Sequence, residues 1–252
     1  MKRLPVQAVA GFSDQGRREL QEDYYLEARD QGIFIVADGF GGPVGGVETS
    51  KLACESVRGF LKKEGGDPDA TLPFVLRSYF SLAGNVLFNA LIHANMKILA
   101  ANRNKGVHER GGASVIAAFL DGDLLALANV GGCSAWLFRN GEPVELVIPR
   151  TYARMLDPLC LEPEAALDIP LAAIGIAEDL EPEIIEYRIQ KGDWVLLQTD
   201  GLGSKAVQTI GSLQIGRASG QVPGAQEPAA EILKVLQQCQ FQENATGLIM
   251  LF

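Results

Sequence analysis

The sequence predicts an α+β fold in which helices and antiparallel β-sheets form separate layers. Short apolar runs of strand length are joined by two-residue turns, Asp121-Gly122 and Asn140-Gly141, as in antiparallel hairpins. Two stretches with helical spacing lie together between residues 47 and 102 instead of alternating with strands. This segregation argues against a doubly wound parallel sheet.

The first half of the chain is expected to hold three strands and one or two long helices. We expect strands at residues 6–13, 24–28 and 33–37, a helix at 47–64, and a helical stretch at 71–102 that is either one helix or two broken near Gly84. The run 33–37 is uninterruptedly apolar, which is typical of a strand buried on both faces. Residues 38–46 contain five glycines, so we expect neither helix nor regular strand there.

The second half is expected to be mostly hairpins. Strands are predicted at residues 113–120, 124–130, 134–138, 143–148, 183–189, 194–198 and 245–252, and a helix at 225–239. Residues 149–181 lack clear periodicity, and both 149–181 and 203–226 are expected to be variable loops near the functional site.

Composition excludes several classes of protein. The chain has 252 residues, 47% of them hydrophobic, and no repeat or long linker divides it, so we expect one domain over residues 1–252. No run approaches the ~18 apolar residues of a membrane helix, and no membrane contact is expected. The net charge is −9 and basic clusters are as short as Arg17-Arg18, which argues against nucleic-acid binding.

The N-terminus and the cysteines indicate a cytoplasmic protein. The apolar stretch 4–10 is too short for a signal peptide and is broken by Pro5 and Gln7, so we predict a strand instead. The four cysteines are far apart and form no C-x-x-C pair, so we expect reduced thiols. We expect a monomer.

Many catalytic groups are absent from the chain. It has only two histidines, and we expect His93 to pack within a helix and His108 to be solvated in a polar turn. Neither a G-x-S-x-G elbow nor a P-loop is present. Serine-hydrolase and P-loop chemistry are therefore excluded.

Carboxylates recur at the ends of the predicted strands. The acids with their neighbours are Glu22-Asp23, Asp38-Gly39, Asp200-Gly201 and Glu243-Asn244. A single Asp-Gly is usually an ordinary turn. Four acidic sites, two of them followed by Gly, weaken that interpretation without excluding it. Converging carboxylates repel one another unless cations are present, and hard divalent cations prefer carboxylate and carbonyl oxygens.

Five motifs in order resemble those of the metal-dependent protein phosphatase family, also called protein phosphatase 2C, in its compact bacterial form. They lie at residues 13–16 with 18–23, 36–42, 111–114 with 128–131, 196–202, and 243–246. The resemblance implies a four-layer αββα sandwich, in which two antiparallel β-sheets are flanked by helices. It also implies a site for two Mn²⁺ or Mg²⁺ ions at one end.

The resemblance assigns a role to each candidate residue. It implies that Asp38 bridges both ions, that the Gly39 carbonyl binds one of them, and that Asp200 and Glu243 complete the other. Glu22 and Asp23 would hold metal-bound waters, and Arg18 would bind the substrate phosphate. The implied activity is hydrolysis of phosphoserine and phosphothreonine in proteins phosphorylated by a Ser/Thr kinase, by metal-activated water attacking in line.

The chain departs from the family pattern at several positions. Gly132 stands where the family usually has an Asp that helps to bind a third metal, and Ser204 where some members have another acid, so a third metal is doubtful. Glu243 replaces the usual Asp, Pro43 a common His and Gln21 an Asn. These changes leave an alternative open, a degenerate phosphatase fold that binds phosphoproteins or regulates a partner without turnover. A third alternative is a sporulation- or stress-type phosphatase that acts on small anti-sigma antagonists.

Overall fold

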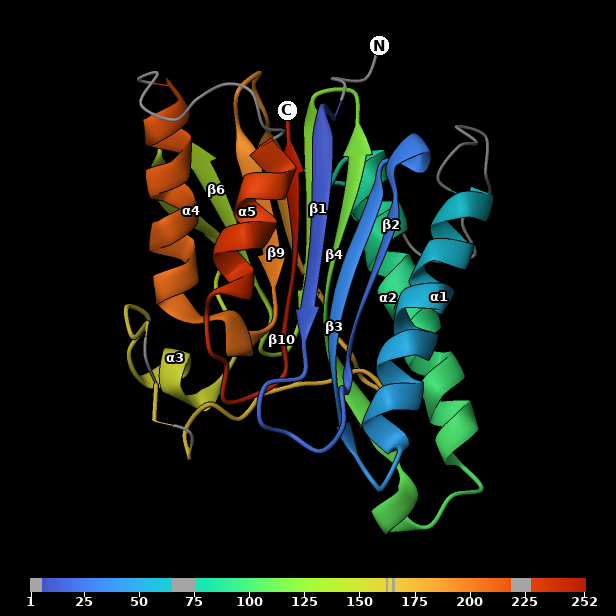
Figure 1. Ribbon diagram of the computed structural model, residues 1–252. Coiled ribbons are helices and arrows are strands. Elements are labelled where there is room, and N and C mark those ends of the chain that lie inside the picture. The colour runs from blue at the N-terminus through green and yellow to red at the C-terminus, as the bar shows by residue number, and fades with distance from the viewer. Residues whose placement is uncertain (1–5, 65–75, 162, 165, 219–227) are drawn as a thin grey trace.

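Two five-stranded antiparallel sheets pack face to face, with helices on their outer faces, in the computed structural model of the chain (Figure 1). The structure describes residues 6–64, 76–161, 163–164, 166–218 and 228–252. The strand order is β1-β10-β9-β6-β7 in the first sheet and β2-β3-β4-β5-β8 in the second. The predicted αββα sandwich is therefore confirmed.

The strands lie close to their predicted positions in the sequence. The first sheet contains β1 (Ala8–Asp14), β10 (Ala245–Leu251), β9 (Trp194–Gln198), β6 (Ser134–Arg139) and β7 (Glu142–Val147). The second contains β2 (Asp23–Ala28), β3 (Ile33–Gly41), β4 (Gly111–Asp121), β5 (Leu124–Val130) and β8 (Glu183–Arg188). The C-terminus lies at the upper end of the sandwich in Figure 1, and the loop between β1 and β2 lies at the opposite end.

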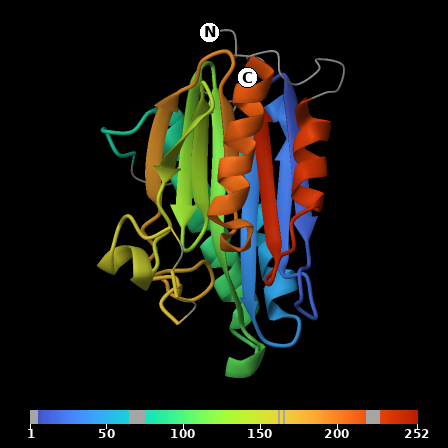
Figure 2. The same ribbon diagram turned by 60° about the vertical axis from the view of Figure 1, so that its left-hand side comes forward.

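Helices cover the outer face of each sheet (Figure 2). The second sheet carries α1 (Gly45–Glu64) and α2 (Leu82–Asn102), and the first carries α4 (Gly203–Ala218) and α5 (Pro228–Gln237). The short helix α3 (Tyr152–Leu156) and three 3₁₀ turns, η1 (Arg29–Gln31), η2 (Val107–Glu109) and η3 (Asp200–Leu202), complete the described elements.

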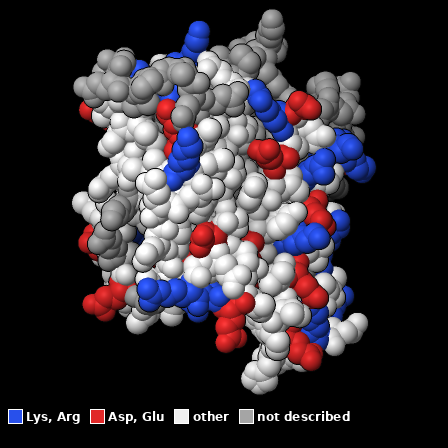
Figure 3. Space-filling model, viewed as in Figure 1, with Lys and Arg blue, Asp and Glu red and all other residues white. Residues whose placement is uncertain are grey.

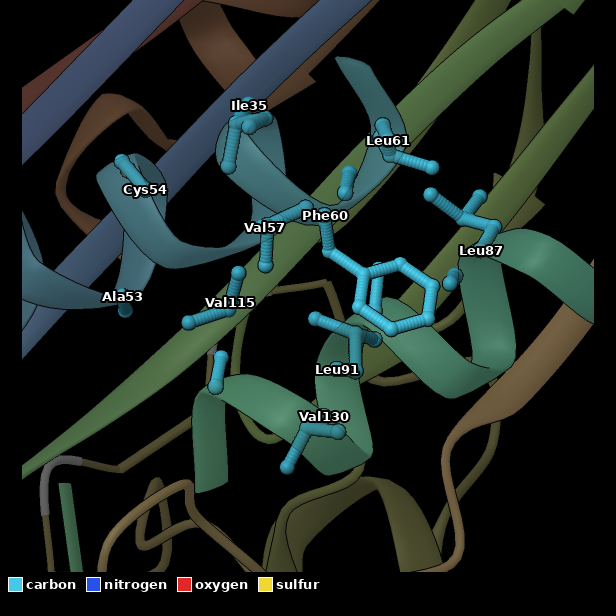
Figure 4. Close-up of a cluster of buried hydrophobic side chains, with 14 of the residues drawn as sticks. Ile35, Ala53, Cys54, Val57, Phe60, Leu61, Leu87, Leu91, Val115 and Val130 are labelled. Carbon is cyan, nitrogen blue, oxygen red and sulfur yellow. The ribbon is translucent and has the colours of Figure 1, made fainter. Parts of the chain in front are cut away.

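Strand β3 contributes to the core on both of its faces. Ile33 and Ile35 pack toward α1 and α2, whereas Phe34 and Val36 pack between the two sheets. Alternate side chains of a strand point to opposite faces, which explains the uninterrupted apolar run. On the helix side, Phe60 of α1 joins the same cluster as the neighbouring α2 side chains (Figure 4).

Helix α2 begins later than predicted. It starts after Ser81, whose hydroxyl accepts a hydrogen bond from Gly84 N at 3.2 Å, while residues 71–75 lie outside the described residues. Gly84 does not break the helix, because it lies in the first turn and allows Ile184 and Glu186 of β8 to approach closely. The Ser81 cap and this close approach explain where α2 begins.

Two segments predicted to be irregular are partly regular. Strand β3 extends to Gly41 and α1 begins at Gly45, because these glycines let the backbone pass close to residues 110–111. Residues 203–218 form α4 rather than a loop. Gln214 is a buried residue of α4. Its side-chain oxygen accepts a hydrogen bond from Gly141 N, and its side-chain nitrogen donates to Phe138 O and Gly192 O. A polar residue therefore stands where the helical pattern would place an apolar one. Of the predicted helix 225–239, residues 228–237 form α5, and 225–227 lie outside the described residues.

Several smaller expectations agree with the structure. All four cysteines are free, His93 is half-buried with its ring centroid 5.3 Å from that of Phe60, and His108 is exposed. Within the described ranges, no helix combines the length and apolarity needed to cross a bilayer. On the face shown in Figure 3, basic and acidic side chains are interspersed.

Candidate metal centre

Asp23 and Asp38 lie opposite each other on neighbouring strands of the second sheet. Asp23 begins β2 and is paired in register with Asp38 of β3. Asp23 is buried. Its Oδ2 accepts a hydrogen bond of 2.9 Å from the hydroxyl of Thr199, the residue that follows β9 of the first sheet. Thr199 also accepts a hydrogen bond from Thr246 N at 3.0 Å. The Thr199 hydroxyl therefore connects Asp23 to the first sheet.

Asp200 brings the first sheet into the same cluster. It follows β9 after Thr199 and begins η3, at the end of the sandwich where β2 starts and β3 finishes. The negative charge of Asp200 raises the pKa of Asp38, and the charge of Asp23 raises the pKa of both Asp38 and Asp200. The two sheets therefore contribute acids to one site. The three predicted carboxylates Asp23, Asp38 and Asp200 are thus brought together.

Burial and mutual repulsion raise the pKa of each of these acids. Burial raises the pKa of Asp23 to about 6, with a smaller contribution from the charge of Glu22. Burial, followed by the charges of Asp200 and Asp23, raises the pKa of Asp38 well above its usual value. Asp200 is an exposed residue, but burial of its carboxylate, followed by the charges of Asp168, Asp23 and Glu243, raises its pKa to about 7. Metal-free, the cluster therefore favours bound protons.

Gly39 is packed where a side chain cannot fit. Its amide donates to Glu22 O at 3.2 Å, and a Cβ added to Gly39 would lie 2.8 Å from that same oxygen and closer still to Gly46 O. Only glycine at position 39 therefore lets this backbone lie so close to Glu22 O and Gly46 O.

Asn244 holds the loop between β1 and β2 in place. Its Oδ1 accepts a hydrogen bond from Glu22 N at 2.8 Å, and its Nδ2 donates to Gln15 O at 2.9 Å and Leu20 O at 2.8 Å. Asn244 belongs to the motif at residues 243–246, but the resemblance assigns it no role. Its three bonds position both Glu22 and the segment that carries Arg18.

Arg18 and Glu243 bind each other. Arg18 Nη2 lies 2.8 Å from Glu243 Oε2, and the side chains are 58% and 54% exposed. The family resemblance assigns Arg18 to the substrate phosphate and Glu243 to a metal ion. Both roles stay predictions, and the structure shows that the two side chains are neighbours at the edge of the site.

The residues present fit hard divalent cations. In the part of the chain that the structure describes, no three His, Cys, Asp or Glu side chains form a complete ligand group, so an ion here would also need carbonyl oxygens and waters. Asp23 Oδ1 is buried without a hydrogen-bond partner among the described residues. A buried oxygen without a partner, beside acids that repel one another, is the environment that a cation or its bound water stabilises. Asp38, Asp200 and the Gly39 carbonyl could hold such ions.

Asp168 is a further acid near the site that the sequence analysis missed. It comes from the segment between α3 and β8, and it is the charged group that contributes most to the raised pKa of Asp200. Burial also raises the pKa of Asp168 itself, while a hydrogen bond with Thr151 lowers it. No strand-end or glycine signal marks Asp168, because it lies in a segment without periodicity.

Comparison with known proteins identifies relatives along most of the chain. The family model described as Protein phosphatase 2C matches residues 10–238. The sequence is 27% identical over 205 residues to the serine/threonine protein phosphatase PstP of Mycobacterium tuberculosis. That match covers 78% of this chain and 36% of PstP, so the chain spans about a third of the length of that curated relative.

Solved structures share the fold. The serine/threonine phosphatase PstP/Ppp of Mycobacterium tuberculosis superposes with a TM-score of 0.74 and 22% identity, covering 96% of this chain and 97% of that one. Stp1 from Staphylococcus aureus gives a TM-score of 0.76 at 16% identity, covering 99% and 96%. A PstP catalytic domain in complex with two manganese ions gives 0.74 at 23%, covering 97% and 98%. The TM-scores and the coverage of both chains establish a common fold.

Proposed function

The chain belongs to the protein phosphatase 2C family, and from that premise we propose that it hydrolyses phosphoserine and phosphothreonine in proteins with two bound divalent cations. One observation carries this proposal. Asp38 of the second sheet and Asp200 beside the first sheet act on each other within a single cluster of acids. Two ions that share carboxylates need such a convergence.

The candidate residues divide the work as follows. Asp38, Asp200 and the Gly39 carbonyl would hold two Mn²⁺ or Mg²⁺ ions, which when bound supply a water of lowered pKa and screen the phosphate charge. Asp23, fixed by Thr199, and Glu22, fixed through its amide by Asn244, would orient waters. Arg18 would give two parallel donors to phosphate oxygens once it leaves Glu243. The acids come from both sheets, so we propose that the sandwich acts as one catalytic domain.

Relatives support the choice of substrate and metal. The relatives PstP and PstP/Ppp are serine/threonine phosphatases, and one related structure contains two manganese ions. We propose that the substrate is a protein phosphorylated by a Ser/Thr kinase, and that the enzyme acts as a cytoplasmic monomer. A relative from Pseudomonas aeruginosa is described as a regulatory component of a T6SS.

Phosphate release tests the proposal directly. p-Nitrophenyl phosphate and a phosphothreonine peptide would be incubated with the protein in Mn²⁺, Mg²⁺ or EDTA, beside Asp38→Asn. We expect turnover with metal that is lost in EDTA and in the variant. A folded protein that binds metal but releases no phosphate would contradict the proposal. That result would favour the phosphoprotein-binding module, an alternative that rests on Gly132 and Ser204, where the family pattern has acids.

A further inference from the structure

Strand β2 is an outer strand of the second sheet, and its open edge begins at the acid cluster (Figure 1). The strand starts with Asp23, whose charge acts on Asp38 and Asp200, and runs away from them to Ala28. A groove of about 680 Å³ follows this edge and is lined by Ser13, Gln21 and residues 23–27. Successive side chains of a strand point to opposite faces of the sheet, so a groove that touches all of them lies along the edge.

The backbone of β2 has hydrogen-bonding groups that face this groove. Gly39 N bonds Glu22 O, so in the antiparallel register residues 24, 26 and 28 bond β3. The N–H and C=O groups of the intervening residues Tyr25 and Glu27 therefore point to the open edge, where the described part of the chain offers them no partner. An extended segment that lies in the groove can pair with both residues.

The side chain of Gln21 already bonds the first position of this edge. Its Oε1 accepts a hydrogen bond of 3.0 Å from Asp23 N, and its Nε2 donates to Ser13 Oγ at 2.9 Å. Ser13 Oγ in turn lies 3.0 Å from Thr246 Oγ1. An amide oxygen on Asp23 N is what a partner strand would supply, so Gln21 takes that place next to the acids. The edge is open from Tyr25 onwards.

Strand β2 lacks features that protect exposed edges from pairing. Such edges are commonly blunted by Pro, by Lys or by irregular pairing. Strand β7, at the far edge of the first sheet, contains Pro143 and pairs with β6 through a register shift after Ala135. Strand β2 contains neither Pro nor Lys, and its pairing with β3 is regular from Asp23 to Ala28. It is therefore suited to accept a further strand.

We propose that the groove along β2 binds the substrate polypeptide as an added antiparallel strand, in which the residues that precede the phosphoserine or phosphothreonine pair with Tyr25 and Glu27. Because β2 runs away from the acids, an antiparallel partner runs toward them and brings the phosphoresidue that follows it to the site. The inference rests on the proposed function, since the acid cluster fixes the position of the phosphoresidue. Pairing of this kind selects phosphoresidues that lie in extended segments of their proteins.

Glu27 gives the groove a charge preference. The described residues that line the groove include the acids Asp23 and Glu27 and no Lys or Arg. The nearby Arg29 does not line it and donates to Val6 O and Gln7 O. A residue opposite Glu27 on the added strand has its side chain on the same face, where opposite charges attract. We therefore expect good substrates to carry Lys or Arg at that position.

A backbone scan of the substrate tests the pairing. A phosphothreonine peptide would carry a single N-methyl group at each residue before the phosphothreonine in turn, and KM and kcat would be measured with Mn²⁺. N-methylation removes one donor, so KM should rise by about two- to tenfold at positions that face β2, the size of one net hydrogen bond. KM at the intervening positions and kcat throughout should not change. A KM profile without this alternation would overturn the added strand.

Charge reversal at Glu27 tests the groove from the protein's side. For Glu27→Lys we expect KM to rise by about two- to fivefold for a peptide with Lys opposite residue 27, and to fall by a similar factor for a peptide with Glu there. Glu142→Lys, at an exposed acid of β7, is the matched control and should change neither KM. p-Nitrophenyl phosphate is too short to reach the groove, so its turnover should be the same in all three proteins. Equal KM shifts in the two variants would mean a net-charge effect and overturn the proposal.

Amide hydrogen exchange separates this inference from the proposed function, because the peptide without phosphate cannot be turned over. That peptide should slow exchange of the Tyr25 and Glu27 amides, and slowed exchange without turnover of any substrate would support the added strand and reject catalysis. Unchanged exchange with normal turnover of p-nitrophenyl phosphate would overturn the strand and leave the phosphatase proposal intact, and loss of both would overturn both. Slowing that follows protein concentration in the absence of peptide would mean that a second copy pairs there, and would also overturn the proposal.

Discussion

Arg18 and Glu243 form an ion pair, with 2.8 Å between Nη2 and Oε2, at the edge of the acid cluster. An Arg that binds a carboxylate has fewer donors left for a phosphate, so the two partners compete for one guanidinium. Glu is one methylene longer than Asp, and this length helps Glu243 to reach Arg18. Substitutions at residue 243 therefore change phosphate binding as well as any metal binding.

Glu243→Asp is expected to strengthen phosphate binding while keeping the charge. The shorter side chain would release Arg18, and an exposed ion pair of this kind is worth about 0–1 kcal/mol, so the gain should reach up to about fivefold. Calorimetric titration of inorganic phosphate with Mn²⁺ present measures it. The gain should vanish when Arg18→Ala is added, and an equal gain in the double variant would disprove the competition.

Metal-free protein is expected to lose stability as the pH rises from about 4 to about 8. The pKa values of Asp23 and Asp200 are raised to about 6 and about 7, so between the ordinary value near 3.8 and these values the folded state binds more protons than the unfolded state. Stability is then greatest at the acid side and falls with rising pH. Thermal unfolding in EDTA at pH 5 and pH 8 measures this.

Asp200→Asn provides the control for that pH dependence. Removing one repelling charge should raise the melting temperature of the metal-free protein by several degrees at pH 8 and less at pH 5. Mn²⁺ should stabilise the wild type more at pH 8 than at pH 5, because protons no longer compete for the ligands. A variant that melts lower than the wild type at pH 8 in EDTA would argue against charge repulsion.

Thr199→Val is expected to destabilise the protein and weaken metal binding. The change removes the donor to Asp23 Oδ2 and the acceptor of Thr246 N, both buried. Unsatisfied buried groups cost about 1–3 kcal/mol, which urea unfolding would detect. Thr199→Ser keeps the hydroxyl and should retain most of the stability and the Mn²⁺ affinity. Equal losses in both variants would mean that the methyl group matters rather than the hydrogen bonds.

Asn244→Ala is expected to lower kcat/KM by about 10- to 100-fold, because misplacing a positioning group by about 1 Å has effects of this size. The three bonds of Asn244 fix the loop that carries Arg18 and Glu22. Asn244→Asp keeps the acceptor for Glu22 N but loses both donors, so it should fall between the wild type and Ala. Steady-state kinetics with p-nitrophenyl phosphate would show this order, and unchanged KM and kcat in both variants would exclude a positioning role.

The strands and their terminal acids could be predicted because they follow short-range rules. Alternation, hairpin turns and the Asp-Gly steps place Asp38 and Asp200 near strand ends without knowledge of the partner sheet, although β3 continues past Asp38 to Gly41. Helix α4 was missed because inward-facing Gln214 is satisfied by three distant backbone groups. The surroundings of Gln214 are made by residues distant in the sequence, so no local sequence pattern indicates them.

Asp168 could not be predicted because its position depends on distant contacts. The segment that follows it is held by α2, where Asn95 bonds Gly175 N at 2.7 Å and Ala177 O at 2.8 Å. Asn102 bonds Gly175 O at 3.2 Å. These asparagines are separated from their partners by more than 70 residues, so a reading of local periodicity has no access to them.

The acids of the candidate site come from two sheets that pack together largely through apolar side chains, and near the acids the Thr199–Asp23 hydrogen bond links them. An ion held by both Asp38 and Asp200 would therefore cross-link the sheets at the end opposite the C-terminus (Figure 1). Chelation would remove this cross-link and leave the apolar interior unchanged. Amide hydrogen exchange should then quicken at the ends of β3 and β9 near the acids, while the middle of both strands stays protected.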